Sequence, residues 1–214
     1  MPRTAFAPIR HWVFDLDNTL YTPDARLFDQ IEERMADWIM ESLDLGRQDA
    51  HALRRTYWQR YGTTLAGLMA EHRIDPDGFL DHVHDIDLAA LAPDPGLRRA
   101  IDALPGRRIV FTNGSRGHAA RILAARGLTD LFEAIYGVED ADYVPKPQRA
   151  AFDAIFDSDN LTPDRSAMFE DDIRNLETPF ALGLRTVHVA GEPDPAPHIH
   201  HHTDDLAGFL SQIV

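Results

Sequence analysis

Two aspartates one residue apart, Asp15 and Asp17, directly follow the short apolar segment at residues 11–14. Two carboxylates in one turn repel each other, so both stay ionised at low cost only in water or beside a cation. Mg²⁺ prefers oxygen ligands and accepts one or two carboxylates while it keeps several waters. A carboxylate beside a metal-bound phosphate can attack phosphorus, because the metal removes the repulsion between the two anions. The alternative is a structural turn closed by Asn18 and Thr19.

A second polar cluster, FTNGS, begins at the end of the apolar segment at residues 108–111. Thr112 offers a hydroxyl group, and residues 113–115 offer backbone N–H groups. A helix is expected to start near Ser115, and the N-terminus of a helix favours a bound phosphate. Ser115 is also a favoured N-cap residue, so a plain helix cap is the structural alternative.

A third candidate is Lys146, which lies between Pro145 and Pro147. Lysine is usually a solvated surface charge. Here a proline on each side stiffens the backbone, and a helix is expected directly afterwards. This context favours a lysine whose side chain is positioned for a purpose.

Three acidic residues in a row follow the apolar segment at residues 167–169, and Asn175 comes about one helical turn later. If the acids open a helix, they complement its dipole. If they lie at a strand end, they repel one another, and a cation would relieve that repulsion. The three acids are Glu170, Asp171 and Asp172.

The elements that must position these clusters are short apolar segments bounded by turn-forming residues, which are typical of buried strands. Strands are predicted at residues 11–14, 108–111, 167–169 and 186–189, with a weaker one at 134–138. Helices are predicted at residues 116–126, ended by Gly127, and at 148–156. This alternation predicts an α/β fold, a Rossmann-like parallel sheet sandwiched by helices. In such sheets the site lies beyond the carboxyl ends of the strands, where the polar clusters are found.

The distance between the first two clusters is far longer than one crossover needs, because 97 residues separate Asp15 from Thr112. Apolar residues at helical spacing predict several amphipathic helices within it. They are Leu27, Ile31, Met35, Trp38 and Ile39, then Ala52, Leu53, Thr56 and Tyr57, then Leu65, Leu68 and Met69. We therefore expect an all-helical insertion over residues 22–92, and a core domain made of residues 1–21 and 93–214. Pro93, Pro95 and Gly96 mark the return to the core domain.

The composition excludes several classes of function. The net charge of −14 argues against non-specific binding of nucleic-acid polymers, which requires lysine and arginine. The absence of cysteine excludes disulfides, thiolate nucleophiles and zinc–cysteine sites. No apolar stretch has the length of a secretory signal or a membrane span. A soluble cytoplasmic protein that does not bind membranes is expected, either a monomer or a homodimer.

The C-terminal region contains a proline-rich segment at residues 191–198 and a cluster of histidines. The proline-rich segment is expected to form a surface loop. The histidines are His198, His200, His201 and His202. A native surface segment is the expectation, followed by a C-terminal helix over 204–213 with Thr203 as its cap. A metal site or a fragment of a tag is the alternative.

Taken in order, the segments DLDNTLY, TNGS, PKP and EDDIRN resemble the four motifs of the haloacid dehalogenase-like hydrolase superfamily. The helical insertion after the first motif is similar to the cap of its first subgroup, the C1-type cap. The first motif, together with YGTTLAGL at residues 61–68, resembles the pyrimidine 5′-nucleotidase branch. The resemblance covers essentially the whole chain. The four motifs are specific for the superfamily, whereas the branch depends on fewer residues.

The resemblance implies a Mg²⁺-dependent phosphomonoesterase. By resemblance, Asp15 is the nucleophile that forms an aspartyl-phosphate, and Asp17 is the acid and base of the two half-reactions. Mg²⁺ would be bound by the Asp15 carboxylate, the Asp17 backbone carbonyl and Asp171. The remaining groups, which would hold the phosphoryl oxygens or neutralise charge, are Thr112, Asn113 and Lys146.

Two departures from the family pattern concern the fourth motif. It begins Glu170-Asp171-Asp172, so Asp171 is aligned with the metal ligand, while Glu170 and Asp172 become supporting residues around it. Asn175 stands where many relatives have an acid. The first motif, by contrast, decides between reactions: the dehalogenases lack an acid two residues after the nucleophile, because a halide leaving group needs no proton. Asp17 therefore favours phosphate esters.

Specificity would depend on side chains that could meet a base or a sugar with rings and hydroxyls; ordinary packing is the alternative. The candidates are Tyr21, Tyr61, Thr63, Thr64 and His72. The expected partner is a small phosphorylated metabolite, with a pyrimidine nucleoside 5′-monophosphate such as UMP or CMP as first choice. Phosphoglycolate or a sugar phosphate is the alternative substrate, and a phosphomutase is a further enzymatic alternative. A catalytically idle phosphate-binding regulator is the alternative outside enzymes.

Overall fold

The computed structural model describes residues 2–214, which form an α/β fold around a six-stranded parallel sheet. The strands are β1 (His11–Phe14), β2 (Arg107–Phe111), β3 (Ala134–Tyr136), β4 (Ser166–Glu170), β5 (Arg185–Val189) and β6 (His201–Thr203). Their order across the sheet is β3-β2-β1-β4-β5-β6. The predicted fold class is thus confirmed, and β1, which carries the aspartate pair at its end, lies in the middle of the sheet.

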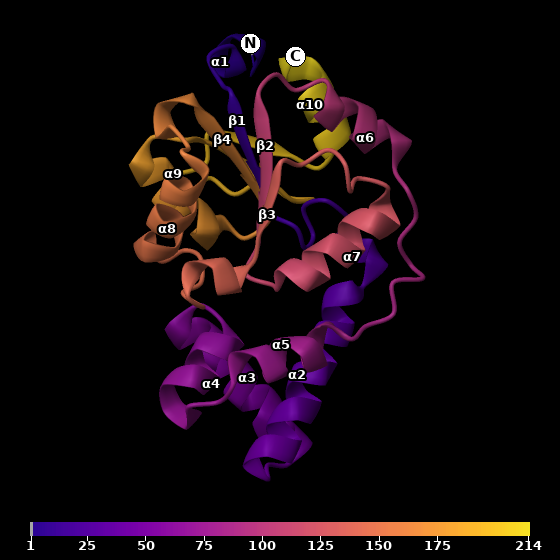
Figure 1. Ribbon diagram of the computed structural model, residues 1–214, viewed down its shortest axis with the longest axis vertical. Helices are drawn as coiled ribbons and strands as arrows, with labels where there is room; N and C mark the ends of the chain where they lie inside the picture. Colours follow the sequence, from indigo (N-terminus) through magenta and orange to yellow (C-terminus); the bar gives the residue numbers. More distant parts are fainter. Residues whose placement is uncertain (1) are drawn as a thin grey trace.

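Helices cover both faces of this sheet. On one face lie α6 (Pro95–Asp102), α7 (Arg116–Arg126) and α10 (Leu206–Ile213), and on the other lie α8 (Arg149–Asp159) and α9 (Glu177–Leu182) (Figure 1). The strands are buried on both sides, so alternate residues serve two cores. Phe14, Val110 and Phe169 belong to one hydrophobic cluster, whereas the neighbouring residues of the same strands belong to the other. Two-sided burial explains why the strands are continuous apolar segments in the sequence.

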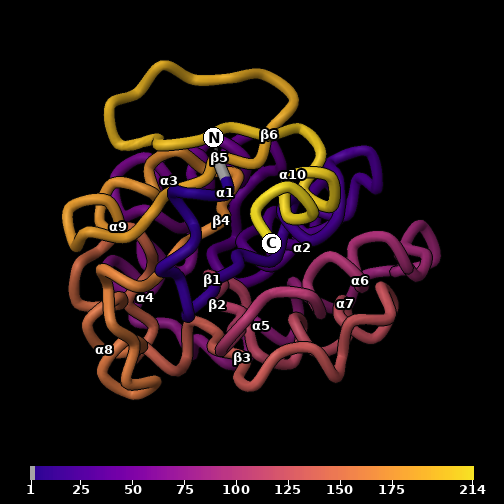
Figure 2. The backbone as a smooth tube through the Cα atoms, turned by 90° about the horizontal axis from the view of Figure 1, so that it is seen from above, coloured from indigo at the N-terminus to yellow at the C-terminus, as the bar shows by residue number. Residues whose placement is uncertain are grey.

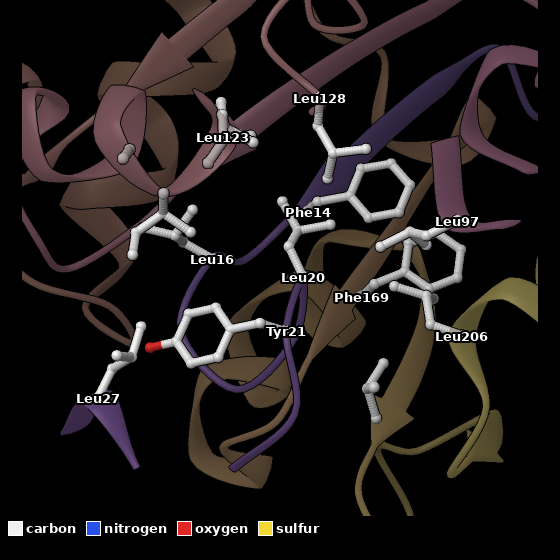
Figure 3. Close-up of a cluster of buried hydrophobic side chains, with 14 of the residues drawn as sticks. Phe14, Leu16, Leu20, Tyr21, Leu27, Leu97, Leu123, Leu128, Phe169 and Leu206 are labelled. Carbon is white, nitrogen blue, oxygen red and sulfur yellow. The ribbon is translucent and has the colours of Figure 1, made fainter. Parts of the chain in front are cut away.

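Between β1 and α6, four α-helices form the insertion that precedes β2. They are α2 (Leu27–Leu43), α3 (Arg47–Tyr61), α4 (Thr64–His72) and α5 (Pro76–His84). They form a separate layer beyond the carboxyl ends of the strands (Figure 1). The predicted stripes of α2 and α4 point inward, since Leu27, Ile31, Ile39, Leu65 and Leu68 are buried. In α3 the prediction was wrong in part, because Tyr57 is buried but Ala52 and Thr56 are exposed. The larger hydrophobic cluster is continuous from the sheet into this layer, through residues such as Leu20, Tyr21 and Leu27 (Figure 3).

Local capping explains where several helices begin and end. The Ser115 side chain accepts a hydrogen bond from the backbone N–H of His118, so the predicted cap of α7 is confirmed, and Gly127 ends the helix in the left-handed conformation. Helix α8 runs to Asp159, beyond the predicted end, and stops at Asn160 with φ of 53°. Helix α10 is capped by Asp205, not by Thr203, because Thr203 still belongs to β6.

Several elements were not predicted, among them α1 (Pro2–Phe6), α5, α6, α9 and β6. Strand β6 consists of His201, His202 and Thr203, and has no apolar segment that would have indicated a strand. It exists because it pairs with β5. Between these two strands the predicted proline-rich surface loop projects widely from the molecule (Figure 2).

Candidate functional site

The polar clusters meet because the strands that carry them are neighbours in a parallel sheet. Asp15 follows β1, Thr112 follows β2, and Glu170 ends β4, and β2 and β4 flank β1 on either side. The backbone N–H of Asp15 donates to the carbonyl of Phe169 at 2.9 Å, so the strand pairing continues up to the site. The three clusters therefore lie side by side at one edge of the sheet.

Lys146 is buried at the centre of the site with 1% of its surface exposed. Its Nζ donates to Asp15 Oδ1 at 2.7 Å, to Glu170 Oε2 at 2.6 Å and to the Phe111 carbonyl at 2.9 Å. Burial alone would lower the pKa of Lys146, but the adjacent carboxylates of Asp15 and Glu170 raise it, so the ammonium group is charged. All three of its protons have acceptors, which fixes the charge in place.

Asn113 holds the backbone of Lys146. The Lys146 N–H donates to Asn113 Oδ1 at 2.8 Å, and Asn113 Nδ2 donates to the Lys146 carbonyl at 3.2 Å. Its side-chain oxygen and one Nδ2 proton are therefore engaged, which leaves the second Nδ2 proton and the backbone N–H as donors for a phosphate. The Thr112 hydroxyl can still donate a hydrogen bond, because its oxygen Oγ1 only accepts one here, from the Gly114 N–H at 2.9 Å. Both residues line the cavity described below.

The side chains of Asp15, Glu170 and Asp171 form a cluster of carboxylates whose oxygen atoms lie within 4.8 Å of one another. Burial raises the pKa of all three carboxyls, and repulsion from Asp15 raises that of Glu170 and Asp171 further, that of Asp171 to about 7. For Asp15 the effect of burial on the pKa outweighs the lowering by Lys146, and Asp17 adds to it. Among the described residues of this cluster only Lys146 supplies compensating charge. A set of oxygen donors with excess negative charge fits a hard divalent cation such as Mg²⁺.

The supporting residues of the fourth motif differ from the prediction. Glu170 belongs to the carboxylate cluster itself, and Asn175 Nδ2 donates to Glu170 Oε1 at 3.3 Å, so Asn175 orients this carboxylate. Asp172 is directed elsewhere: it accepts from the backbone N–H of Arg174 and pairs with its guanidinium. The backbone N–H of Asp172 donates to Glu170 Oε1 at 3.2 Å, and a supporting role of Asp172 for the metal ligand stays a prediction. On the other side, Asn18 Nδ2 donates to Asp171 Oδ2 at 3.3 Å.

Asp17 is surrounded by groups that sequence reasoning missed. Its Oδ1 accepts from the Tyr21 hydroxyl at 2.6 Å and lies 3.0 Å from His118 Nε2. Burial would raise the pKa of Asp17, but His118 and the hydroxyl of Tyr21 outweigh this effect and lower it. His118 lies on α7, a helix that was predicted, three residues after the cap Ser115. This position near the helix start is the only feature of the sequence that could have indicated His118 as a site residue.

His84, at the end of α5 in the insertion, stacks on His118. Their ring centroids are 4.3 Å apart with an interplanar angle of 11°, and His84 Nδ1 lies 3.0 Å from Ser115 Oγ. Burial, and then the neighbouring His118, lowers the pKa of His84 to about 3, so its imidazole is neutral near pH 7. Nothing in the sequence spacing could have brought His84 to this position, because it comes from a different layer of the fold.

A cavity of ≈ 670 Å³ lies between the strand ends and the insertion. On the core side it is lined by Asp15, Asp17, Thr112, Asn113 and the segment 170–175. On the insertion side apolar and aromatic side chains dominate: Phe28, Ile31, Met35, Trp58, Leu65, Phe79, Leu80 and Val83. Arg174 reaches across from the core, with its Cζ 3.7 Å from the centre of the Trp58 ring. This geometry is a cation–π contact between the two sides.

The candidate specificity residues are only partly at this cavity. Thr63 and Thr64 line it, but the Thr63 hydroxyl caps α4 and the Thr64 hydroxyl is directed at the Arg54 carbonyl. Tyr21 is 3% exposed and bonded to Asp17, so it cannot meet a base or sugar. Tyr61 donates to Glu71, and His72 is bonded to the Tyr57 hydroxyl; neither contributes to the cavity as the described residues form it.

The histidine cluster near the C-terminus is engaged in the sheet edge and its loop. His198 Nε2 lies 2.9 Å from the Ile173 carbonyl, and His202 Nε2 lies 2.8 Å from the Ala190 carbonyl. His200 Nδ1 bonds to Thr186. These contacts support a native structural segment, as expected. Among residues 2–214 the group of side chains placed to hold a metal ion is that of Asp15, Glu170 and Asp171, and it includes none of these histidines.

In the part of the chain from residue 2 to residue 214, no helix combines the length and apolar character that a membrane crossing requires.

Comparison with known proteins gives a consistent result. The family model for haloacid dehalogenase-like hydrolases matches residues 9–183. The chain is 25% identical over 188 residues to phosphate metabolism protein 8 of Saccharomyces cerevisiae, which covers 80% of this chain and 58% of that protein. It is 28% identical over 132 residues to enolase-phosphatase E1 of a Bradyrhizobium strain, which covers 62% of this chain and 54% of that one. The matches thus span little more than half the length of these relatives.

Solved structures with the same fold include a HAD phosphatase from Thermococcus onnurineus, at a TM-score of 0.64 and 14% identity, covering 96% of this chain and 97% of that one. The magnesium-bound YfnB of Bacillus subtilis has a TM-score of 0.61 and 16% identity over 96% of this chain and 98% of that one. The L-2-haloacid dehalogenase from Xanthobacter autotrophicus has a TM-score of 0.53 and 18% identity over 95% and 88%. At these identities the likeness concerns the fold.

Proposed function

Because this chain belongs to the haloacid dehalogenase-like hydrolase family, we propose that it is a Mg²⁺-dependent phosphomonoesterase. One observation carries the proposal: Asp15, with its Oδ1 neutralised by buried Lys146, lies in a carboxylate cluster, and Asp17 stands two residues further along the same turn. The names of the two relatives with 25% and 28% identity, phosphate metabolism protein 8 and enolase-phosphatase E1, both refer to phosphate.

The nucleophile in this proposal is Asp15. Lys146 binds its Oδ1, so the other carboxylate oxygen attacks phosphorus, and the bond from phosphorus to the leaving oxygen breaks. The Thr112 hydroxyl and the backbone N–H of Asn113 hold phosphoryl oxygens, and Lys146 neutralises the charge that gathers between nucleophile and phosphate. The product of this step is an aspartyl-phosphate on Asp15.

Asp17 serves both half-reactions. Its Oδ1 is bonded to Tyr21 and faces His118, so its Oδ2 is the oxygen available for proton transfer. As an acid it gives a proton to the departing alkoxide, and as a base it then takes a proton from the water that attacks phosphorus. The bond between phosphorus and Asp15 breaks in this second step, which releases inorganic phosphate and restores both carboxyls.

Mg²⁺ would be held by the carboxylates of Asp15 and Asp171 and by the backbone carbonyl of Asp17, with Glu170 close by. When bound, it would supply positive charge to the phosphoryl oxygens and offset the repulsion between the carboxylates. The donor chemistry of the cluster supports this assignment. Asp17 supports phosphate esters over the halide displacement carried out by some proteins of this fold, since only an alkoxide leaving group needs a proton.

The finer form of the proposal is a nucleoside 5′-monophosphate, with UMP and CMP as first choice, and residues 22–92 acting as a cap over the site. Two exposed aromatic rings support a flat leaving group: Phe28 is 39% exposed and Trp58 45%, and both line the cavity. Such faces can stack a base. They replace Tyr21, Tyr61 and His72 as the side chains on which base recognition would depend.

Phosphate release from a panel of nucleotides, sugar phosphates and phosphoglycolate tests the proposal, with Mg²⁺ or EDTA, and with Asp15→Asn as the blank. We expect release that needs Mg²⁺ and is lost in the variant. A preference for UMP or CMP supports the nucleotide form, whereas a preference for phosphoglycolate or a sugar phosphate rejects it and keeps the chemistry. Retained turnover in Asp15→Asn contradicts the covalent route, and silence across the panel favours a phosphate-binding regulator.

A further inference from the structure

The orientation of Asp17 is determined by two donors that reach it from different parts of the chain. The Tyr21 hydroxyl comes from four residues away, and His118 Nε2 comes from 101 residues away, on α7. Both contact the same oxygen, Oδ1. A carboxylate that receives two bonds on one oxygen cannot rotate without breaking both. The pair therefore holds Oδ2 in a single direction.

The state of the His118 ring follows from its surroundings. An ionised carboxylate only accepts hydrogen bonds, so Nε2 carries the proton that it shares with Asp17. The other nitrogen, Nδ1, is buried and has no hydrogen-bond partner among residues 2–214. Leaving a buried polar atom unpaired costs about 1–3 kcal/mol. An apolar ring would fill this site without that cost, so packing alone does not explain an imidazole here.

The remaining face of His118 is covered by the insertion. His84 stacks on it at 4.3 Å and is itself held by Ser115 Oγ, which also accepts from the His118 backbone N–H at 3.2 Å. The His118 imidazole is thus held between His84 of the insertion and the start of α7. His118 cannot swing away from Asp17 while His84 is in place, because its side chain is fully buried.

We propose that His118 is a positioning residue for Asp17, which directs the free oxygen of that carboxylate at the leaving group, and that His84 of the insertion holds His118 in this orientation. The inference rests on the proposed phosphomonoesterase function. It adds that proton transfer to the leaving group depends on a residue of the insertion that is not an acid or base in the reaction.

The test uses leaving groups of different basicity. 4-Nitrophenolate can leave without being protonated, whereas the alkoxide of glycerol 2-phosphate must receive a proton as it leaves. Only hydrolysis of glycerol 2-phosphate therefore depends on a well-placed acid. The ratio kcat/KM is measured for both substrates with Mg²⁺, because it reports the steps up to departure of the leaving group. For His118→Phe we expect a fall of about 10- to 100-fold with glycerol 2-phosphate and of less than about 3-fold with 4-nitrophenyl phosphate.

Conservative variants separate positioning from packing. His118→Gln keeps an N–H donor, so it should recover much of the kcat/KM for glycerol 2-phosphate that His118→Phe loses. His84→Ala should show a smaller version of the selective loss, and His84→Phe, which keeps the stacked ring but not the bond to Ser115 Oγ, should lose less than His84→Ala. His51→Phe, on α3 outside the cavity, is the control and should change neither substrate.

A readout independent of turnover is the tautomer of His118, which ¹⁵N shifts of the imidazole report. The proposal requires the Nε2–H form; an Nδ1–H form contradicts it. Equal losses with both substrates in His118→Phe, without rescue by glutamine, also overturn it and leave only a structural role. If the folded wild type releases no phosphate from either substrate or from the panel above, the proposed function itself fails and this inference fails with it.

Discussion

The core side and the insertion side of the cavity are lined by different kinds of side chains. The core side consists of strand ends with buried charges, of which Lys146 is paired with Asp15 at 2.7 Å and with Glu170 at 2.6 Å. On the insertion side apolar and aromatic side chains dominate, of which Phe28 and Trp58 are considerably exposed, although Glu32, Arg54 and Arg55 also line it. Charges that must act on phosphorus need fixed positions. A surface that receives the rest of a substrate needs area and adaptability instead. The comparison separates catalysis from recognition within one cavity.

The strongest way to test this separation is to remove the central charge of the core side. Lys146→Met should reduce kcat by about 10²- to 10³-fold, because Lys146 is the side-chain cation that pairs with Asp15 among the described residues. It should also lower the free energy of unfolding by about 3–5 kcal/mol, because Asp15 and Glu170 lose their buried partner. Phosphate release and urea denaturation measure the two effects.

The matched control is Arg149→Met on α8, which removes an exposed cation paired with Asp153. It should change neither quantity noticeably. If Lys146→Met keeps wild-type kcat, the core side is not the catalytic side.

The next largest effect is expected from His84, at the contact between the core side and the insertion side, and concerns the pH dependence of stability. His84 has a pKa of about 3 in the folded protein and an ordinary value of 6.5. Its folded-state pKa is lowered, so the unfolded chain binds more protons below pH 6.5, and stability falls as the pH falls from there. From about pH 7 to about pH 5 this residue should cost about 2 kcal/mol of unfolding free energy.

His84→Phe removes this titration and should lose correspondingly less stability over the same interval. The comparison is made by urea denaturation of wild type and variant at each pH, so that the other histidines contribute equally to both. Parallel pH profiles would show that His84 is not held neutral by burial.

A change on the insertion side should affect binding more than chemistry. Trp58→Ala removes an exposed ring of the cavity and the partner of Arg174. We expect KM to rise by about 10-fold and kcat to change by less than about 3-fold. Phe180→Ala is the matched control, since this aromatic residue is exposed to a similar extent (39%, against 45% for Trp58) but lies outside the cavity as the described residues form it. A fall in kcat with unchanged KM would contradict the separation.

The smallest effect is expected from residues of the insertion that point away from the cavity. Tyr61→Phe and His72→Gln remove contacts with Glu71 and Tyr57 that lie within the insertion itself. Both variants should keep kcat and KM within about 2-fold of the wild type. A larger change in KM would mean that substrate reaches beyond the cavity in the direction of α3 and α4.

Much of the fold was predictable because its strands are buried on both faces and therefore stand out as apolar segments. The same pattern failed for β6, whose three residues contain no aliphatic side chain, and for α5. The cap of α10 was placed at Thr203 instead of Asp205, since both residue types cap helices and only the strand pairing of Thr203 decides between them.

The site was predictable where it lies at strand ends. Asp15, Thr112, Glu170 and Asp171 follow strands directly, and parallel strands bring their carboxyl ends together. Side chains whose partners lie elsewhere were not predictable in detail. Asn113 binds the Lys146 backbone, Asp172 binds Arg174, and Tyr21 binds Asp17. Each contact depends on a direction that residue type and spacing do not contain.

The sequence by itself thus determined the α/β sheet, the helical insertion and the order of the four chemical clusters, because hydrophobic period and turn residues are local properties. Only the tertiary structure decided which side chains face the cavity and which are engaged elsewhere. It placed His84 of the insertion on His118 and His118 on Asp17, and put Trp58 opposite Arg174. These contacts join residues far apart in the chain, and they form only when the layers pack against each other.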